Sequence, residues 1–384
     1  MPARSAQPSD LRSASPVAAS RKVVQLIAPL PVGGAESVVR ALAAGMHRSG
    51  RDVEVVALVE DSGAHAFVTR MRNDGVAVTA VACGRRRYLA EVREVTRLLR
   101  RAGATLLHTH LNHADVVGYL AARRCGIPVV ATVHGFTGSG WKNRAYIWLD
   151  MRLIHRFDAV ICVAGNVRDR VLGEGCDPDR VHLVPNGYAL LAAVARNQAR
   201  AKLGLTAAGQ VVGWVGRLTW EKGADLLIQA MGRLRMPQVT AVLVGAGADQ
   251  ERAIAQAASH NPASVVRFVG QVDDASSLLS AFDVLAISSR TEATPMVLLE
   301  AMASGVPVVA FAVGGIPSVL DNRSAWLVPP GDTGAFAGAL QEALQDPAEA
   351  ARRTAAARET LRARYGLDRW IQQVETVYDR VTRS

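Results

Sequence analysis

The sequence has few cysteines, and they are not arranged as metal ligands. Of 384 residues only four are cysteine, namely Cys83, Cys125, Cys162 and Cys176. None belongs to a C-x-x-C pair, and no cluster of Cys and His residues is present. These spacings argue against a zinc site and against a disulfide framework. We therefore expect a reducing, cytoplasmic compartment.

Signals for secretion and membrane insertion are also missing. No apolar segment near the N-terminus has the pattern of a signal peptide. One long uncharged run, residues 301–320, contains Gly305, Pro307, Gly314 and Pro317. These residues would interrupt a membrane-spanning helix. We expect a buried strand with flanking loops in this run instead.

Lysine is scarce, although the protein is basic. Lys occurs only at positions 22, 142, 202 and 222, and the 44 Lys and Arg residues exceed the 34 Asp and Glu residues to give a net charge of +10. The abundance of Arg and Ala resembles a composition bias as much as a functional patch. Positive charge still favours anionic partners such as nucleotides, phosphates, acidic lipids or nucleic acid. A length of 384 residues with 49% hydrophobic residues predicts two ordinary domains or one large one.

Short apolar runs alternate with amphipathic segments along the first half of the chain. Residues 1–21 contain few large apolar groups, and we expect a flexible tail there. The helical patterns include residues 35–48 and 88–101. Seven apolar runs predict strands, at residues 23–28, 53–58, 76–81, 106–108, 129–133, 159–163 and 181–184. This alternation is typical of a parallel sheet covered on both faces.

The same rhythm restarts after Pro185-Asn186-Gly187. Six further strands are expected, at residues 211–215, 239–244, 265–268, 284–287, 308–311 and 325–328. The fold class is therefore α/β, with two doubly wound Rossmann-like domains facing a central cleft. We expect residues 22–190 and 191–365 to form these domains, with a final helix within residues 366–384. Ligands of such sheets bind at the carboxyl ends of the strands, so the loops there carry the function.

Among these loops, residues 288–303 contain the largest number of candidate functional residues. Thr294 is expected to cap a helix whose first residue is Pro295. The N–H groups of Met296 and Val297 would then point into the cleft, where a helix N-terminus attracts phosphate. Glu300 lies one turn deeper on the same face, and both Glu300 and Glu292 can accept hydrogen bonds from sugar hydroxyls. The alternative is an ordinary capped helix, which is disfavoured because Leu298 and Leu299 make an incidental Glu costly.

Two cations follow another strand. Arg217 stands at the strand end in Gly216-Arg217-Leu218, and Lys222 lies in the next turn. Such a pair can clamp a diphosphate, the Arg by its fork and the Lys as a point charge. On this evidence alone, a diphosphate clamp and two ordinary solvent-exposed loop charges are equally favoured interpretations. The rarity of Lys adds weight to Lys222.

Glycines and histidines occupy strand ends in the first half. Gly33 and Gly34 let the backbone approach a ligand, but neither they nor Gly245-Ala246-Gly247 form the G-x-G-x-x-G pattern of nicotinamide sites. Glu36 also has an ordinary interpretation, as an acid of a first helical turn. His134 follows a strand, and its roles as a cleft residue and as a structural residue are evenly matched. His108 and His110 flank a further strand end without the carboxylates or thiolates of a metal site.

Two basic stretches suit a membrane surface. Arg85-Arg86-Arg87 leads into a helix with Arg93, Arg97 and Arg100 opposite its apolar side, and residues 141–148 mix aromatics with cations. Both could touch anionic lipid. A packed helix with a solvated face, plus a loop at the edge of the cleft, is somewhat favoured over this.

Taken in order, these residues resemble the retaining family-4 glycosyltransferases of GT-B fold. The resemblance rests on the ordered set Gly33-Gly34-Ala35-Glu36, Thr132-Val133-His134, Val184-Pro185-Asn186-Gly187, Gly216-Arg217, Glu221-Lys222-Gly223, Glu292 to Ala303 and Val313-Gly314-Gly315. It covers about residues 23–380. Three positions depart from the family pattern. Ala293 and Pro295 stand where many relatives have Gly, and Ser318 stands where an acid is common.

The resemblance implies a division of labour between the domains. The C-terminal domain would hold a nucleotide-sugar, most readily a UDP-sugar, and the N-terminal domain the acceptor, with the final helix crossing back. Arg217 and Lys222 would hold the diphosphate, Glu300 the ribose, and the backbone near Gln271 and Val272 the base. Glu292 and His134 would contact the donor sugar. Neither a cofactor nor a metal is needed.

The implied reaction moves a hexose to an acceptor hydroxyl, in cell-surface polysaccharide or glycolipid synthesis. We favour front-face attack, with a leaving-phosphate oxygen as the base, over Glu292 as a covalent nucleophile. Two rivals stay open. One is a nucleotide-sugar epimerase of the same fold. The other is a non-catalytic protein that binds a membrane surface or nucleic acid, although no helix-turn-helix, zinc or RNP pattern supports nucleic acid.

Overall fold

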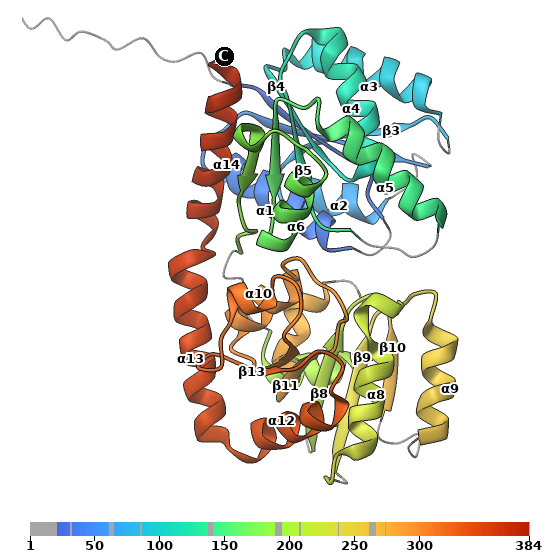
Figure 1. Ribbon diagram of the computed structural model, residues 1–384, viewed down its shortest axis with the longest axis vertical. Coiled ribbons are helices and arrows are strands. Elements are labelled where there is room, and N and C mark those ends of the chain that lie inside the picture. The colour runs from blue at the N-terminus through green and yellow to red at the C-terminus, as the bar shows by residue number, and fades with distance from the viewer. Residues whose placement is uncertain are drawn as a thin grey trace, which may run out of the picture.

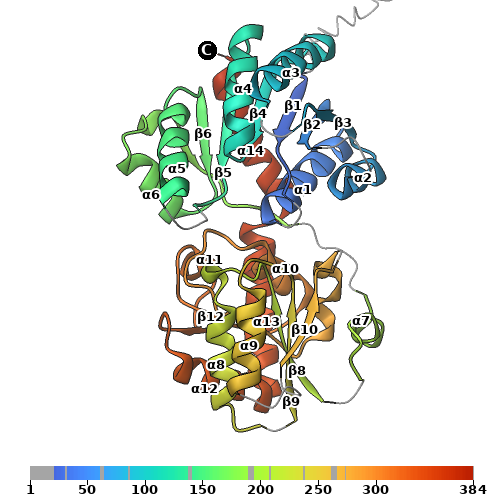
Figure 2. The same ribbon diagram turned by 90° about the vertical axis from the view of Figure 1, so that its right-hand side faces the viewer.

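The computed structural model describes residues 21–30, 33–60, 65–84, 87–136, 141–188, 194–206, 209–236, 238–260, 266–272 and 274–383. The expected tail, apart from Arg21, lies outside the described residues, as do Arg85, Arg86 and the side chains of residues 141–146. Two stacked α/β units and a pair of long C-terminal helices make up the molecule (Figures 1 and 2).

The N-terminal unit is built on a seven-stranded sheet in the order β3-β2-β1-β4-β5-β6-β7. Its strands are β1 Val23–Ile27, β2 Val53–Val59, β3 Ala77–Ala82, β4 Leu106–His110, β5 Val129–Val133, β6 Ala159–Cys162 and β7 Val181–Leu183. Every pairing between them is parallel. The strand order reverses between β1 and β4, which is where ligands of such sheets bind.

Helices cover both faces of this sheet. They are α1 Gly34–Arg48, α2 Ala66–Asn73, α3 Tyr88–Ala102, α4 Asn112–Cys125, α5 Trp141–Ile154 and α6 Gly165–Gly173, with a 3₁₀ turn η1 at Pro178–Arg180. Right-handed crossovers place α1 and α2 on one face and α3 to α6 on the other, because the chain moves in opposite directions from β1 and from β4. Helix α3 shows how the sequence dictates this packing. It buries Val92, Val95 and Leu99 and ends at Gly103 in the left-handed region.

The C-terminal unit holds a six-stranded parallel sheet in the order β10-β9-β8-β11-β12-β13. Its strands are β8 Gln210–Val215, β9 Val239–Val244, β10 Val266–Gly270, β11 Val284–Ile287, β12 Val308–Phe311 and β13 Trp326–Val328. Its helical elements are α7 Arg196–Lys202, η2 Trp220–Lys222, α8 Ala224–Arg233, α9 Gln250–His260, η3 Ala275–Ala281, α10 Met296–Ser304, α11 Ile316–Val319 and α12 Thr333–Gln345. All thirteen expected strands are therefore present, each within two residues of its expected ends.

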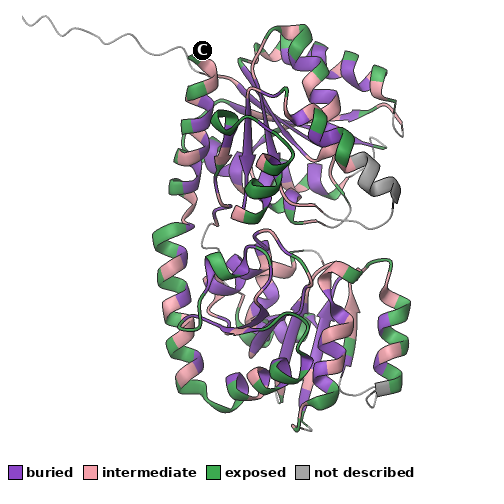
Figure 3. Ribbon diagram, viewed as in Figure 1, coloured by how far each residue is buried: buried purple, intermediate pink, exposed green. Residues whose placement is uncertain are grey.

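Helices α13 Pro347–Arg364 and α14 Leu367–Thr382 run along both units (Figure 1). Helix α14 packs on α1 of the N-terminal unit, as the expected crossover requires, and buries Trp370, Ile371 and Tyr378. Backbone at Tyr188 pairs with Gly366 where the two helices meet. The buried residues of both sheets and the inner faces of these helices form the core (Figure 3).

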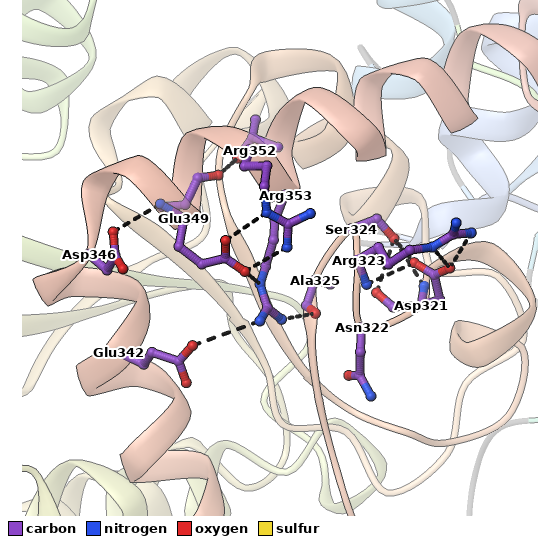
Figure 4. A network of polar contacts seen from close by, with 12 residues as sticks. Asp321, Asn322, Arg323, Ser324, Ala325, Glu342, Asp346, Glu349, Arg352 and Arg353 are labelled. Atoms are coloured by element: carbon purple, nitrogen blue, oxygen red, sulfur yellow. Dashed lines mark hydrogen bonds and ion pairs between the residues drawn. The ribbon is translucent and has the colours of Figure 1, made fainter.

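Arg353 fixes α13 to the C-terminal sheet (Figure 4). Its guanidinium pairs with Glu349 at 2.7 Å, donates to the Ala325 carbonyl at 2.7 Å and lies over the Trp326 ring. The side chain is 15% exposed, so these contacts lie in partly screened surroundings and contribute modestly. They set where the last two helices begin their path toward the N-terminal unit.

No helix among these residues is long and apolar enough to cross a membrane. The run 301–320 contains the expected buried strand, β12, but the segments beside it include the end of α10 and the short helix α11 rather than loops alone.

Candidate active site

The carboxyl ends of the two sheets face each other, and two helix N-termini meet there. Helix α1 begins at Gly34 with Gly33 as its N-cap, and α10 begins at Met296. The two helices are in contact, and a Cβ built on Gly34 would lie 3.8 Å from the Met296 side chain. The first N–H groups of each helix have no partner within it and carry partial positive charge. The interface between the units is therefore suited to an anion.

Lys222 and Glu292 form an ion pair at this interface. Lys222 Nζ lies 2.6 Å from Glu292 Oε1, which also accepts a hydrogen bond from Ser289 Oγ at 2.7 Å. The Glu292 side chain is only 7% exposed. Two residues that the sequence analysis placed in the site are thus in direct contact. Ser289 is an additional partner that the sequence analysis did not single out.

The η2 turn that carries Lys222 is held by Arg290. The Arg290 guanidinium pairs with Asp225 through two hydrogen bonds of 2.8 and 2.6 Å and lies over the Trp220 ring. Its backbone N–H donates to the Glu221 carbonyl at 2.8 Å. A bidentate Arg–carboxylate pair fixes geometry as well as charge. Arg290 is therefore a support for Lys222 that sequence reasoning missed.

The Glu292 backbone is held from both units. Asn166 Nδ2 donates to the Glu292 carbonyl at 3.0 Å across the interface, and Gly315 N donates to the same oxygen at 3.2 Å. Gly314 has φ +54°, and any Cβ there would clash with that carbonyl. The Gly314-Gly315 pair therefore serves the close approach of one loop to another.

The expected start of α10 was wrong by one residue. Thr294 does not cap the helix, because its hydroxyl donates to the Val163 carbonyl of the N-terminal unit at 3.0 Å. Pro295 is the N-cap, with extended backbone, and Met296 is the first helical residue. The N–H groups of Met296 and Val297 still stand at the helix start, where an anion would meet them.

Arg217 lies close enough to Glu36 for their charges to interact across the interface. Burial raises the pKa of Glu36, and the Leu30 N–H and the Arg217 charge oppose that rise. Glu36 Oε1 accepts from Leu30 N at 2.6 Å, while Oε2 is buried without a partner among the described residues. The interpretation of Glu36 as an ordinary acid of a first helical turn was therefore incomplete. Its only sequence signal was the adjacent Gly33-Gly34 pair.

Glu300 is buried one turn into α10. The residue is 9% exposed, and burial, with a contribution from the nearby charge of Asp274, raises the pKa of its carboxyl to about 7. Burial raises the pKa of the Tyr188 phenol, and the charges of Glu300 and Asp274 add to that rise. A carboxyl poised near neutral pH in a crevice is typical of functional sites. This supports the choice of Glu300 over an exposed helical Glu.

Three histidines are grouped on the N-terminal side. His134 is partly exposed and precedes Gly135, which approaches Ala293 of the other unit, whereas His108 and His110 are fully buried behind it. His134 Nε2 lies 3.0 Å from His110 Nδ1, and His108 contacts both Thr132 and Tyr378 at 2.7 Å. Burial lowers the pKa of His134 to about 4 and that of His110 well below its usual value. Both rings are therefore neutral near pH 7, so one donates and the other accepts in the shared hydrogen bond. Sequence reasoning noted His110 only as a residue beside a strand end.

Backbone strain occurs beside these rings. Leu111, directly after His110, has φ +75° and ψ 145°, a region that non-glycine residues avoid. Such strain persists where surrounding contacts overdetermine it, often at functional sites.

On the opposite sheet, Gln271 and Val272 follow β10 and share the edge that carries Arg217. Their contact with a base stays a prediction.

Comparison with known proteins decides the family. The family described as Glycosyltransferase Family 4 matches residues 32–190, and Glycosyl transferases group 1 matches residues 195–360. The alpha-maltose-1-phosphate synthase of Mycolicibacterium smegmatis is 31% identical over 312 residues, covering 73% of this chain and 80% of that protein. The chain belongs to the retaining family-4 glycosyltransferases. The resemblance stated from the motifs is confirmed.

Further relatives of this glycosyltransferase agree. The D-inositol 3-phosphate glycosyltransferase of Xylanimonas cellulosilytica is 32% identical, covering 72% of each chain. Among solved structures, Anabaena Alr3699/HepE in complex with UDP-glucose superimposes with a TM-score of 0.82 at 24% identity, covering 93% of this chain and 99% of that one. The sucrose-phosphate synthase of Thermosynechococcus elongatus gives 0.78 at 24% identity, covering 94% and 99%. These neighbours show that the fold is GT-B, as expected. Membership of the family shows that the enzyme transfers a sugar from a nucleotide-sugar.

Proposed function

We propose that this glycosyltransferase moves a hexose from a UDP-sugar to an acceptor hydroxyl, with retention at the anomeric carbon. The observation that carries the proposal is the Lys222–Glu292 pair beside the start of α10. A cation and a helix N-terminus there favour a diphosphate, while the carboxylate suits the hydroxyls of the attached sugar. UDP and UDP-glucose occupy the structural neighbour from Anabaena, which supports the choice of donor.

The donor would lie along the C-terminal wall of the cleft. We assign the diphosphate to Arg217, Lys222 and the N–H groups of Met296 and Val297. We assign the ribose hydroxyls to Glu300 and the base to the backbone at Gln271 and Val272. Glu292 and His134 would contact the donor sugar, with Gly33, Gly34 and the start of α1 closing over it. Each assignment places a group of suitable charge or hydrogen-bonding capacity at the cleft edge where the family resemblance predicts it.

The proposed chemistry is front-face displacement. The acceptor oxygen forms a bond to the anomeric carbon while the bond from that carbon to the β-phosphate oxygen breaks on the same face. The acceptor proton passes to the departing phosphate. Arg217, Lys222 and the start of α10 stabilise the negative charge that develops there. Glu292 is less suited to act as a covalent nucleophile, because Lys222 and Ser289 already hold its carboxylate.

The acceptor side is less specified by the site. We propose a sugar, lipid-linked or small-molecule acceptor bound by the N-terminal unit, residues 22–190, and a role in cell-surface polysaccharide or glycolipid synthesis. The enzyme would act in the cytoplasm, in peripheral contact with the inner face of an anionic membrane. The neutral histidines beside the cleft are consistent with an acceptor hydroxyl, which needs hydrogen bonds rather than charge.

A thermal-shift panel tests the donor assignment. UDP, GDP and ADP, each free and with common sugars attached, would be added to the wild type, to Arg217→Ala and to Arg235→Ala. Arg235 is an exposed arginine outside the cleft and serves as the matched control. UDP forms at 100 times Kd should stabilise the wild type and the control by about 2.7 kcal/mol, and Arg217→Ala much less. Equal stabilisation by all three nucleotides, or an unaffected Arg217→Ala, would remove the support for this site.

Product analysis separates transfer from the remaining enzymatic rival. The donor sugar would be followed by mass and stereochemistry with and without candidate acceptors. A glycosyltransferase releases UDP and forms a glycoside only when an acceptor is present. A nucleotide-sugar epimerase would convert the sugar in the absence of any acceptor, and that result would overturn the proposed function.

A further inference from the structure

We propose that the layer formed by α3, α4 and α5 is a docking face for an anionic membrane surface. This α3–α5 face is defined by the exposed residues of the segments 87–136 and 147–156, whose side chains the structure describes. It covers one side of the N-terminal sheet, because α3 packs on α4 and α4 packs on α5 (Figure 1). This face is separate from the proposed donor site, which lies on the C-terminal unit.

The charge of this face is of one sign. All nine exposed charged residues in these two segments are arginines, at positions 87, 93, 97, 100, 101, 123, 124, 152 and 156. The described acids of the same segments are turned inward, since Glu91, Asp115 and Asp150 are buried. Glu94 is half-buried and bonds to Arg97 at 2.5 Å. A cluster of this size is what an anionic lipid surface attracts, each cation adding to the attraction within a Debye length.

Exposed apolar side chains accompany the arginines. Leu89 is 70% exposed, Trp148 52% and Leu149 59%, and Leu120 is also exposed. These four are half of the eight large exposed hydrophobics found in the described part of the chain. A cationic surface studded with Leu and Trp is typical of proteins that lie on a bilayer and bury such groups at the headgroup–acyl boundary.

The three helices present one continuous surface. Arg100 Nη2 donates to the Arg124 carbonyl at 2.9 Å, which joins the last turns of α3 and α4. Arg123 Nη2 donates to the Arg156 carbonyl at 3.1 Å, which joins α4 to the end of α5. On α3, the spacing of Leu89, Arg93 and Arg97 keeps them on a single side of the helix. The cations and apolar groups therefore lie on one layer rather than on separate loops.

Stabilisation of helix ends explains only part of this pattern. Arginines in a last helical turn interact favourably with the helix dipole, which accounts for Arg100, Arg101, Arg123, Arg124 and Arg152. It does not account for Arg93 and Arg97 in the middle of α3, or for exposed Leu89. A polyanion such as RNA would also be attracted by the arginines. The solvent-exposed leucines favour a lipid surface, because they have no part in phosphate or base contacts.

The position of the face relates it to catalysis. Helices α3 and α5 begin at the carboxyl ends of β3 and β5, the edge of the sheet that borders the cleft. If the proposed function holds, docking on this face would bring an acceptor anchored in the same membrane within reach of the donor site. The docking itself does not depend on that function.

Vesicle flotation tests the docking face with the full-length chain. The vesicles would be phosphatidylcholine alone, or phosphatidylcholine with about one third phosphatidylglycerol. The test variant reverses three arginines of the face, Arg93→Glu, Arg101→Glu and Arg124→Glu. The control makes the same change in net charge on α13 and α14, with Arg362→Glu, Arg364→Glu and Arg369→Glu. A third variant, Leu89→Ser with Leu149→Ser, removes apolar groups and leaves the charge unchanged.

The wild type and the control should float with the anionic vesicles and not with the neutral ones, and added salt should weaken the binding. The reversed-charge variant should bind at least tenfold more weakly, and the Leu variant several-fold more weakly. Equal loss in both triple variants would show a response to net charge alone and overturn the proposal. The proposal would also be overturned if the protein bound RNA but not vesicles, and if Leu89→Ser with Leu149→Ser left the binding to RNA unchanged. Nucleotide-induced thermal shifts, measured on each variant, separate failure of the docking face from failure of the proposed function.

Discussion

The two walls of the cleft differ in how they are built. On the C-terminal wall, charged groups are paired and the loops are fixed by backbone contacts, as with Lys222 and Glu292 or Arg290 and Asp225. On the N-terminal wall the central groups are neutral histidines beside a strained leucine, and buried atoms such as His110 Nε2 have no partner among the described residues. Preorganised charge is thus concentrated on the wall to which the proposed function assigns the departing diphosphate. The opposite wall offers neutral histidine rings, together with the buried acid Glu36 near Arg217.

The largest expected effect comes from removing a cation of the C-terminal wall. Lys222→Ala should lower kcat/KM by about 10³-fold, or about 4 kcal/mol, because the leaving diphosphate loses its point charge and Glu292 loses its partner. Initial rates with saturating acceptor would measure this. Lys202→Ala, an exposed lysine on α7, is the control and should be unaffected. A loss below tenfold in Lys222→Ala would mean that the charge of this wall is not used in the transition state.

Removing a histidine of the N-terminal wall is expected to lower the catalytic rate by a smaller factor. His134→Ala should lower kcat/KM by about 10²-fold, the scale of one positioned hydrogen-bonding group. Because the pKa of the His134 ring lies near 4, the wild-type rate should show no step from this residue between pH 6 and 8. His110→Gln would position His134 less well and should cost less than His134→Ala, with the same pH profile. A rate that follows a histidine titration near pH 6.5 would contradict the neutral character of this wall.

The buried carboxyl of Glu300 on the C-terminal wall makes the stability of the protein depend on pH. Its folded pKa of about 7 lies above the usual 4.5, so the unliganded protein loses stability as pH rises from about 4.5 to 7. Glu300→Gln should therefore be more stable than the wild type at pH 8, by as much as about 3 kcal/mol, with the difference vanishing near pH 4. Denaturant unfolding at several pH values would show this. UDP affinity should fall about tenfold in the variant, and an unchanged affinity would remove Glu300 from the donor site.

The smallest effect concerns the contact that joins the walls. Asn166→Ala deletes the hydrogen bond to the Glu292 carbonyl and should raise the KM for the donor about threefold, with little change in kcat. Steady-state kinetics would separate the two parameters. Asn73→Ala, at the exposed end of α2, is a matched control. A large fall in kcat would instead indicate that this contact governs closure of the two units.

Local patterns were enough to predict the fold and to single out Lys222 and Glu292, which the structure brings into contact. Parallel strands buried on both faces read as continuous apolar runs, so the ends of β5, β9, β11 and β12 were predicted to the residue. Arg217, Lys222 and Glu292 were singled out because they follow predicted strands, where ligands of such sheets bind, and because their motifs resemble those of the family. The sequence could not show that Lys222 contacts Glu292, since 70 residues separate them.

Predictions failed or fell short where a contact crosses from one unit to the other. Thr294 has the residue type and position of an N-cap, yet its hydroxyl bonds to Val163 in the other unit, and a tertiary contact overrode the local preference. Glu36 looked like an ordinary first-turn acid until the structure placed it near Arg217. The roles of Gln271, Val272 and the two domain boundaries stay predictions, because no contact described above depends on them.

The return of α14 to the first sheet has a consequence for biosynthesis. Residues 367–382 complete the packing around α1, where the Ile371 side chain approaches Gly45 so closely that a Cβ at Gly45 would crowd it. A ribosome makes that helix only after all of the second unit has been translated. Until then the N-terminal unit exposes the apolar face of α1 that α14 covers in the finished protein. A chaperone that binds such apolar surfaces would therefore bind this chain before its first domain is complete.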